Sequence, residues 1–191
     1  MSKPDDVILP AYFAERWEFL HRLKGGGQAT TWVVRQKGTK AEGVLKLPLE
    51  FDRVSIGRFQ REIEVIRSLN HPAIVKLLDY SIDPIQLGYV SPRGKVLPDF
   101  WTTKTAGMNA TELYDLAYGF MRSIGEGLAL VHERGAVHRD LKPSNVIVLE
   151  PWVSPQPVVI DFGLTFRQGD ERLSIFEGKV AVNKIAAPAE A

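Results

Sequence analysis

Two segments of the chain repeat apolar residues at helical spacing. Residues 55–69 carry one series and residues 116–131 the other, each at steps of three and four, which places the apolar side chains on one face of a helix. The first series is Phe59, Ile63, Ile66 and Leu69, and the second is Leu116, Phe120, Ile124, Leu128 and Val131. Pro72 follows the first predicted helix and Gly135 the second, as residues of that type do where helices end.

Shorter apolar runs predict strands. Between Trp17 and Leu47 they alternate with glycine-rich stretches, which favours antiparallel strands. The central runs there are Trp32–Val34 and Val44–Leu47, and further strands are predicted at Ile74–Leu78, Phe100–Thr103, Val146–Leu149 and Val158–Ile160. No internal repeat is present, so the pattern predicts several strands, one helix among them, and then a more helical region.

Composition adds mainly exclusions. The 191 residues are 45% hydrophobic and 25% charged, which is ordinary for a globular protein with a buried core. The formal net charge of +1 gives no bulk field that would favour nucleic acid or an anionic membrane. The sequence has no cysteine, no apolar run of membrane-spanning length and no secretory signal at its start, so a cytoplasmic location is expected.

The strongest candidates for functional side chains lie in two segments. They are the run His138-Arg139-Asp140-Leu141-Lys142-Pro143-Ser144-Asn145 and the later triplet Asp161-Phe162-Gly163. The run and the triplet supply carboxylates, an ammonium group and an amide oxygen within a short length of chain. Transfer of a phosphoryl group needs a carboxylate near the attacking hydroxyl, a cation near the moving group and oxygen ligands for Mg²⁺. A lone aspartate in a loop is more often a turn former, so the argument rests on the order and spacing of the set.

In that order and spacing the two motifs resemble the catalytic loop and DFG element of protein kinases. The resemblance implies an α+β, two-lobed fold with a small antiparallel sheet and one helix in the first lobe. It divides the chain into an N-terminal extension (1–16), an N-lobe with ATP-binding elements (17–104) and a partial, helical C-lobe (105–191). Lys142 is typical of the members that phosphorylate serine and threonine.

The resemblance also implies roles. Asp140 would be the base for the attacking hydroxyl, and Lys142 would offset charge on the transferred group. Asn145 and Asp161 would bind Mg²⁺. Lys46, in Val44-Leu45-Lys46-Leu47, would hold the phosphates of ATP and pair with Glu62 on the first predicted helix. The alternatives without a functional role are that Lys46 is a solvated lysine at a strand edge and that Glu62 forms a helix-surface pair with Arg58.

Further positions match the family's ATP site less closely. The triplet Gly25-Gly26-Gly27 stands where the family covers the phosphates, although a flexible hairpin turn is the alternative. Thr31 and Val44 replace the usual valine and alanine of the adenine pocket. The hinge that would bind adenine is placed at Thr102 to Thr105, with Thr103 and Thr105 as contacts. An apolar spine between the lobes is assigned to Ile66, Leu77, His138 and Phe162.

The chain also departs from the family. Residues 187–190 only resemble its APE motif, and the helices that follow in a complete kinase domain have no counterpart before Ala191. One face of the second predicted helix would then be open to a partner. Ser174 is the candidate for a phosphorylated residue that would pair with Arg139.

Two functions follow from these observations. The first is a protein kinase that transfers the γ-phosphate of MgATP to a serine or threonine of a protein substrate. The second is a truncated, kinase-like module that binds nucleotide or a protein with little or no catalysis. A small-molecule phosphotransferase is disfavoured by Lys142 and by the Asp-Phe-Gly triplet.

Overall fold

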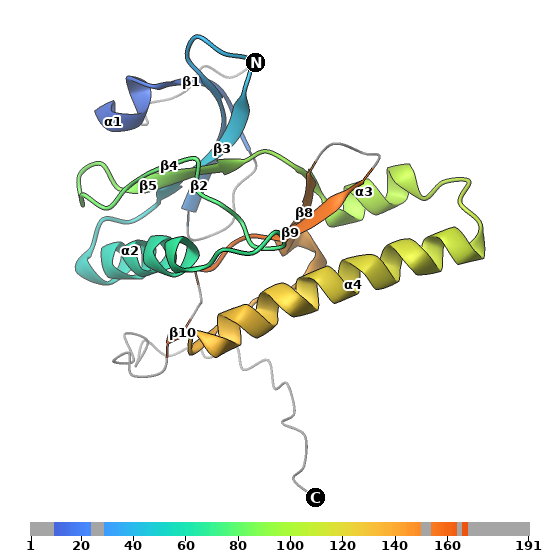
Figure 1. Cartoon of the computed structure of the whole chain (residues 1–191). Coiled ribbons are helices and arrows are strands. Elements are labelled where there is room, and N and C mark those ends of the chain that lie inside the picture. The colour runs from blue at the N-terminus through green and yellow to red at the C-terminus, as the bar shows by residue number, and fades with distance from the viewer. Residues whose placement is uncertain (1–9, 24–28, 150–153, 164–165, 168–191) are drawn as a thin grey trace, which may run out of the picture.

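The computed structural model describes residues 10–23, 29–149, 154–163 and 166–167. A five-stranded antiparallel sheet forms the first part, in the order β1-β2-β3-β5-β4. Its strands are β1 (Trp17–Arg22), β2 (Ala29–Gln36), β3 (Glu42–Pro48), β4 (Asp79–Ser81) and β5 (Gly88–Pro92). The helix α2 (Arg53–Ser68) lies along one face of this sheet (Figure 1).

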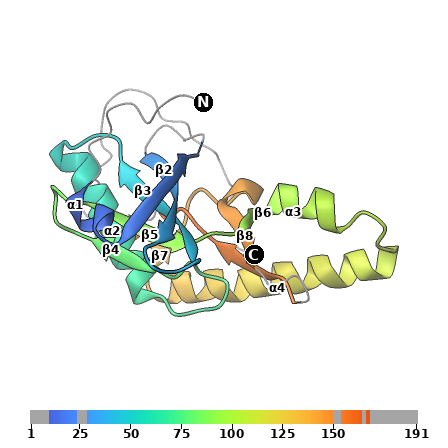
Figure 2. The ribbon, with the colours of Figure 1, turned by 90° about the horizontal axis from the view of Figure 1, so that it is seen from above.

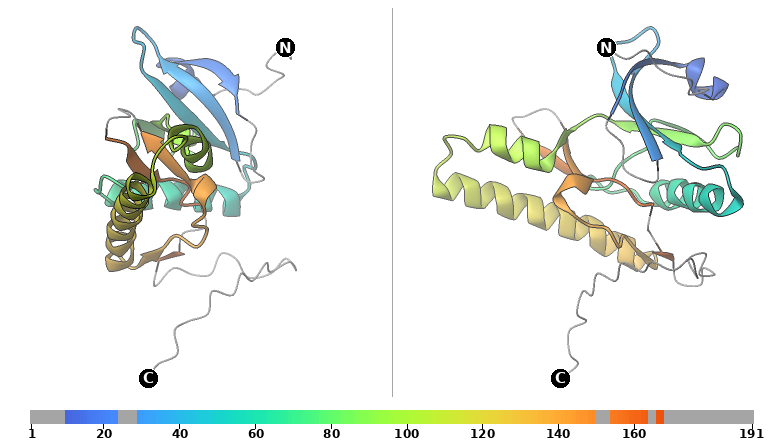
Figure 3. Two further views of the ribbon diagram at one scale, coloured as in Figure 1. Left: turned by 90° about the vertical axis from the view of Figure 1, so that its right-hand side faces the viewer. Right: turned by 180° about the vertical axis from the view of Figure 1, so that it is seen from behind.

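The second part is helical around a smaller sheet. Figure 2 shows the long helix α4 alongside α3 and the small sheet, starting at the end remote from the first part and running back toward it. The elements are β6 (Lys95–Val96), α3 (Leu97–Lys104), α4 (Ala110–Glu133), β7 (Ala136–Val137), the 3₁₀ turn η1 (Pro143–Asn145), β8 (Val146–Leu149), β9 (Gln156–Val159) and β10 (Phe166–Arg167). The small sheet has the order β6-β8-β9, and β7 pairs with β10. The predicted two-lobed α+β fold is confirmed (Figure 3).

Both predicted helices form, and local sequence explains where they begin. Asp52 caps α2 by accepting hydrogen bonds from the backbone N–H groups of Val54 and Ser55. Asn109 caps α4 and forms a capping box with Glu112. Gly135, with a φ of 69°, ends the α4 segment in a left-handed conformation that glycine adopts without strain.

The strand predicted at Phe100–Thr103 is wrong, because these residues belong to α3. Aromatic and β-branched side chains favour strands, but here the threonine hydroxyls bond to carbonyls one turn back. Thr102 Oγ1 donates to Pro98 O at 2.7 Å and Thr103 Oγ1 to Asp99 O at 2.8 Å. Phe100 is buried against Phe120 of α4, so packing between the two helices outweighs strand propensity.

The strand predicted at Ile74–Leu78 is also wrong. Ile74 makes one isolated parallel bridge to Val159 of β9, and no strand forms around it. Ala73, Ile74 and Val75 are buried, which explains why the apolar run reads like a strand in the sequence. The segment connects the two parts of the molecule, since Val75 N–H donates to Val159 O and Val159 N–H to Ala73 O.

A short helix that the sequence analysis missed precedes β1. The helix α1 (Ala11–Ala14) places Phe13, fully buried, among Trp17, Trp32 and Leu47. Four residues are too few for the periodicity that reveals longer helices. The predicted boundaries at 16 and 104 remain predictions, although α1 packs as part of the first lobe. Among the described residues, no helix combines the length and apolar character needed to cross a membrane.

Candidate active site

Lys46 is positioned by the middle of β3. Side chains alternate between the two faces of a strand, and the neighbours Leu45 and Leu47 are buried on the opposite face. Lys46 therefore points toward α2 and the second lobe. In the sheet it lies opposite Thr31 on β2 and Tyr89 on β5.

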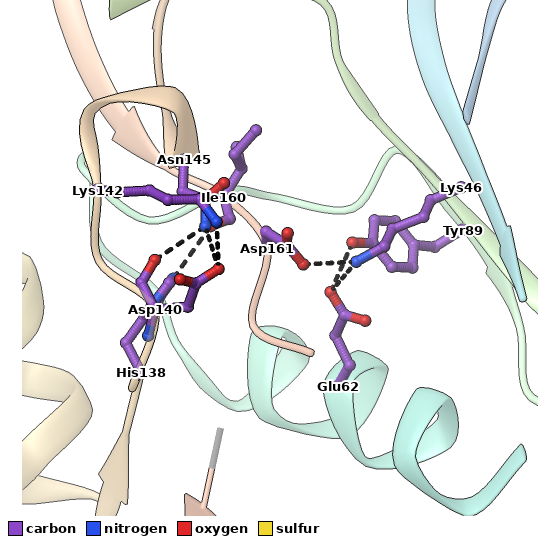
Figure 4. A network of polar contacts seen from close by, with 9 residues as sticks. All are labelled: Lys46, Glu62, Tyr89, His138, Asp140, Lys142, Asn145, Ile160 and Asp161. Atoms are coloured by element: carbon purple, nitrogen blue, oxygen red, sulfur yellow. Dashed lines mark hydrogen bonds and ion pairs between the residues drawn. The ribbon is translucent and has the colours of Figure 1, made fainter. Parts of the chain in front are cut away.

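The ammonium of Lys46 contacts two carboxylates that are distant in sequence. Its Nζ donates to Glu62 Oε1 on α2 at 2.7 Å and to Asp161 Oδ1, just after β9, at 2.7 Å (Figure 4). The predicted pair of Lys46 and Glu62 is thus formed, and the alternative of a surface glutamate is wrong because Glu62 is 2% exposed. Tyr89 joins them by donating its hydroxyl to Glu62 Oε1 at 2.8 Å.

Charge and burial shape the protonation of this cluster. Burial alone would lower the pKa of Lys46, but negative charge from Glu62 and Asp161, together with Tyr89, raises it well above its ordinary value. Burial would likewise raise the pKa of Asp161, yet the nearby Lys46 lowers it. Lys46 is therefore a cation and Asp161 an anion at neutral pH.

Asp140 lies in a compact cluster of its own. Lys142 Nζ donates to Asp140 Oδ2 at 2.7 Å, and Asn145 Nδ2 donates to the same oxygen at 3.0 Å and to Asp140 O at 2.8 Å. His138 links this loop to the segment after β9 through hydrogen bonds of both ring nitrogens. Its Nδ1 accepts from Asp140 N–H at 3.3 Å, so the proton on Nε2 is the one donated to Ile160 O at 3.0 Å.

Backbone strain is concentrated at these two clusters. Of the non-glycine residues that the structure describes, Arg139 and Asp161 have positive φ angles, of 64° and 67°. Such conformations cost about 1–3 kcal/mol each and persist where the surroundings hold them. Arg139 precedes the predicted base Asp140, and Asp161 is a predicted metal ligand, so the strained backbone lies where these side chains are oriented.

Both clusters open into one cavity of about 590 Å³. Thr31, Lys46, Glu62, Asp140 and Asp161 are among its lining residues, and they come from both lobes. This volume lies in the range of small-molecule sites. Acidic and basic groups converge on it, as expected for a ligand that carries phosphates and a cation.

The predicted metal ligands fit Mg²⁺ as a partner of phosphate. Asn145 uses its amide nitrogen for Asp140, which leaves the amide oxygen as the atom that could bind a cation. Asp161 offers its carboxylate. Within the described ranges there is no group of three or more His, Cys, Asp or Glu side chains placed to hold a metal ion by themselves. Mg²⁺ is commonly held by one or two carboxylates together with substrate phosphates, so a small donor set suits this metal.

The other predicted contacts are distributed unevenly. Thr31 lines the cavity, whereas Val44 lies on β3 opposite Ser91 and is not in the lining. Thr103 and Thr105, which the resemblance assigned to the hinge, lie at the end of α3, also outside the lining. The structure instead connects the large sheet to α3 through residues 93–96. The triplet Gly25-Gly26-Gly27, Ser174 and residues 187–190 lie outside the described residues.

The predicted apolar spine is compatible with the packing. Ile66, His138 and Phe162 are buried, and Leu77 packs partly buried against the same core. The rings of His138 and Phe162 meet edge to face at 4.7 Å between centroids. The sequence analysis missed Tyr89, because it predicted no strand between Leu78 and Phe100. The apolar run Leu87-Gly88-Tyr89-Val90 was the signal that could have revealed β5.

Comparison with known proteins agrees with this geometry. Residues 18–180 match the protein kinase domain family. The chain is 28% identical over 169 residues to the serine/threonine-protein kinase pkn2 of Myxococcus xanthus, covering 86% of this chain and 19% of that protein. It is 30% identical over 160 residues to the probable serine/threonine-protein kinase PknB of Lactococcus lactis, covering 80% and 24% respectively.

A similar relation holds to the serine/threonine-protein kinase PkaA of Streptomyces coelicolor, at 30% identity over 162 residues, 78% of this chain and 26% of the relative. The chain thus spans about a quarter or less of the length of these relatives. The family match covers most of the chain, and it coincides with the part that carries the two polar clusters. The chain therefore belongs to the protein kinase family, among relatives named serine/threonine kinases.

Proposed function

We propose that the chain transfers the γ-phosphate of MgATP to a serine or threonine hydroxyl of a protein substrate. The observation that carries the proposal is the convergence of Lys46, Asp140 and Asp161 on one cavity, although 115 residues separate the first from the last. Chance placement of loop aspartates would not bring them to the same cavity as a partly buried, paired lysine.

Each side chain has a distinct task in this proposal. Lys46, held by Glu62, binds the α- and β-phosphates and so fixes the nucleotide. Asp140 accepts the proton of the attacking hydroxyl, while a new bond forms between that oxygen and the γ-phosphorus. The bond from the γ-phosphorus to the β-γ bridging oxygen breaks, and ADP leaves with the electron pair. Lys142, 2.7 Å from Asp140, supplies positive charge where the transferred phosphoryl group moves.

Asn145 and Asp161 hold the metal in this proposal. Bound Mg²⁺ supplies neutralisation of charge on the phosphates. The present bond between Lys46 and Asp161 brings the phosphate-binding and metal-binding groups together at 2.7 Å. This contact fixes the two groups relative to each other. Such positioning matters for the proposed reaction, because a misplacement of about 1 Å can cost a hundredfold in rate.

The test is transfer of labelled phosphate. The purified chain is incubated with γ-labelled ATP, Mg²⁺ and a generic protein acceptor, beside the Asp140→Asn variant. A matched control is Asp115→Asn, since Asp115 is exposed on α4, outside the cavity. We expect the wild type and the control to transfer label and Asp140→Asn to lose about 10²–10⁴-fold in rate. Equal background label in all three proteins would overturn the proposal.

The alternative of a binding module has its own signature. A thermal shift with MgATP reports binding without catalysis, because a ligand that binds the native state raises its melting temperature. Stabilisation of the wild type by MgATP without label transfer would favour the binding module. Neither stabilisation nor transfer would contradict both functions.

A further inference from the structure

A buried tyrosine shares the glutamate that orients Lys46. Tyr89 is the second residue of β5, opposite Lys46 on β3 and Tyr80 on β4, and only 4% of it is exposed. Its ring packs against Phe59 of α2 at 5.6 Å between centroids. The side chain thus bridges the sheet and the helix beside the phosphate-binding lysine.

The hydroxyl of Tyr89 ends on the same atom that Lys46 contacts. It donates to Glu62 Oε1 at 2.8 Å, while Lys46 Nζ lies 2.7 Å from that oxygen (Figure 4). An ionised carboxylate only accepts hydrogen bonds, so the phenol is the donor. Burial and the charge of Glu62 raise the pKa of Tyr89 well above its ordinary value, and the phenol therefore keeps this proton.

Glu62 needs this second donor. Lys46 is shared among three anionic groups once nucleotide is present, because it already contacts Glu62 and Asp161 and would also bind phosphate. A buried carboxylate that loses part of its partner is costly. The Tyr89 hydroxyl is a neutral donor that stays on Glu62 whatever Lys46 binds.

The strand that carries Tyr89 is itself closely packed. A Cβ atom at Gly88 would lie 2.7 Å from Leu47 Cδ2, 3.0 Å from Phe13 Cε2 and 3.1 Å from Lys46 O. Contacts this short leave β5 little room to shift toward β3 or α1. Tyr89 therefore reaches α2 from a fixed base.

From this geometry we propose that Tyr89 is a positioning residue for phosphoryl transfer. Its hydroxyl holds Glu62, and with it α2, where Lys46 is aimed at the phosphates. The inference rests on the proposed function, because it assigns a role to Tyr89 through the nucleotide-binding lysine. It adds a residue that neither the motifs nor their spacing indicate.

The first experiment needs no nucleotide. Tyr89→Phe removes the hydroxyl and keeps the ring against Phe59. Tyr80→Phe is the matched control, because Tyr80 pairs with Tyr89 on the neighbouring strand but is not part of the Lys46 network. We expect faster amide hydrogen exchange in α2 for Tyr89→Phe and wild-type exchange there for Tyr80→Phe. Equal exchange in α2 of both variants would overturn the proposal, whether or not the protein transfers phosphate.

A double-mutant cycle then asks whether Tyr89 acts through Glu62. Affinity for MgATP is measured with a non-hydrolysable analogue for Tyr89→Phe, Glu62→Gln and the double variant. We expect Tyr89→Phe to weaken binding about tenfold in the wild-type background and less than about twofold beside Glu62→Gln. A loss of the same size in both backgrounds would show that the hydroxyl acts on general packing, and would overturn the role assigned to it. Absence of label transfer by the wild type would instead count against the proposed function.

Discussion

The two polar clusters of the cavity are built in different ways. The Lys46 cluster draws Lys46, Glu62, Tyr89 and Asp161 from β3, α2, β5 and the segment after β9. The Asp140 cluster draws its side chains from residues 138–145. In the first, the side chains of Glu62 and Lys46 are only 2% and 15% exposed, although Asp161 is 44% exposed; in the second, Lys142 and Asp140 are 50% and 32% exposed.

Because of this difference, we expect the two clusters to contribute differently to the stability of the fold and to the reaction. A buried charge left without a partner is strongly destabilising, whereas an exposed ion pair contributes little. We therefore expect the Lys46 cluster to support both the fold and nucleotide binding, and the Asp140 cluster to serve the reaction at small cost to the fold. The clusters meet at Ile160 and Asp161, because Ile160 O accepts from His138 and the next residue contacts Lys46.

The largest effect should come from breaking the buried cluster. Lys46→Ala leaves Glu62, 2% exposed, without its cation, and we expect a loss of about 3–5 kcal/mol in the free energy of unfolding. Urea denaturation followed by circular dichroism measures it. A loss below about 1 kcal/mol would mean that this cluster is energetically no different from the exposed one.

An intermediate effect is expected where the Asp140 cluster is buried. Asn145 is 6% exposed and its amide nitrogen donates to both the carbonyl and the carboxylate of Asp140. Asn145→Ala should lower the free energy of unfolding by about 1–3 kcal/mol, because it removes these bonds from a buried site. The same denaturation measurement tests it, with Ser144→Ala as control at an exposed neighbour. Equal stability of the two variants would contradict the expectation.

Stability at acidic pH should depend on the charge of Asp161 in the Lys46 cluster. The pKa of Asp161 is lowered in the folded protein, so its contribution is complete above the unfolded value near 3.8 and is lost as the pH falls through the folded value. The difference in melting temperature between wild type and Asp161→Asn should therefore be constant from about pH 5 to pH 8 and shrink below about pH 4. A difference that does not change with pH would show that the charge of Asp161 is not what stabilises the fold.

The smallest effect is expected at Lys142. Its pair with Asp140 is half exposed on the lysine side, so Lys142→Ala should change the free energy of unfolding by less than about 1 kcal/mol. The rate of phosphate transfer should fall all the same, because charge near the moving phosphoryl group is lost. A loss of stability as large as that of Lys46→Ala would remove the contrast between the clusters.

Sequence reasoning worked best where the chemistry is local. The run His138 to Asn145 carries its groups in consecutive positions, and they do cluster around Asp140. Helical periodicity predicted α2 and α4 because each helix is long and amphipathic. The pair of Lys46 and Glu62 was predicted from the family resemblance, since nothing in the spacing of the two residues would bring them together.

It failed where packing between elements overrides local preference. Phe100 and its neighbours read as a strand, yet they form α3 because Phe100 is buried against Phe120. The apolar run from Ile74 reads as a strand, yet it is a buried connection between the lobes. In both cases a short window shows that residues are buried but not the geometry in which they are buried.

The sequence by itself predicted the long helices and the antiparallel strands between Trp17 and Leu47, and its motifs predicted the family and the candidate residues for phosphoryl transfer. The helices and strands follow from periodicity, whereas the family and the candidate residues follow from the resemblance of the motifs to those of protein kinases. Only the tertiary structure decided that Tyr89 shares Glu62 with Lys46 and that Asp161 reaches the same ammonium. The physical reason is that these contacts join residues up to 115 positions apart, and the pairing of strands and the packing of α2 set their distances.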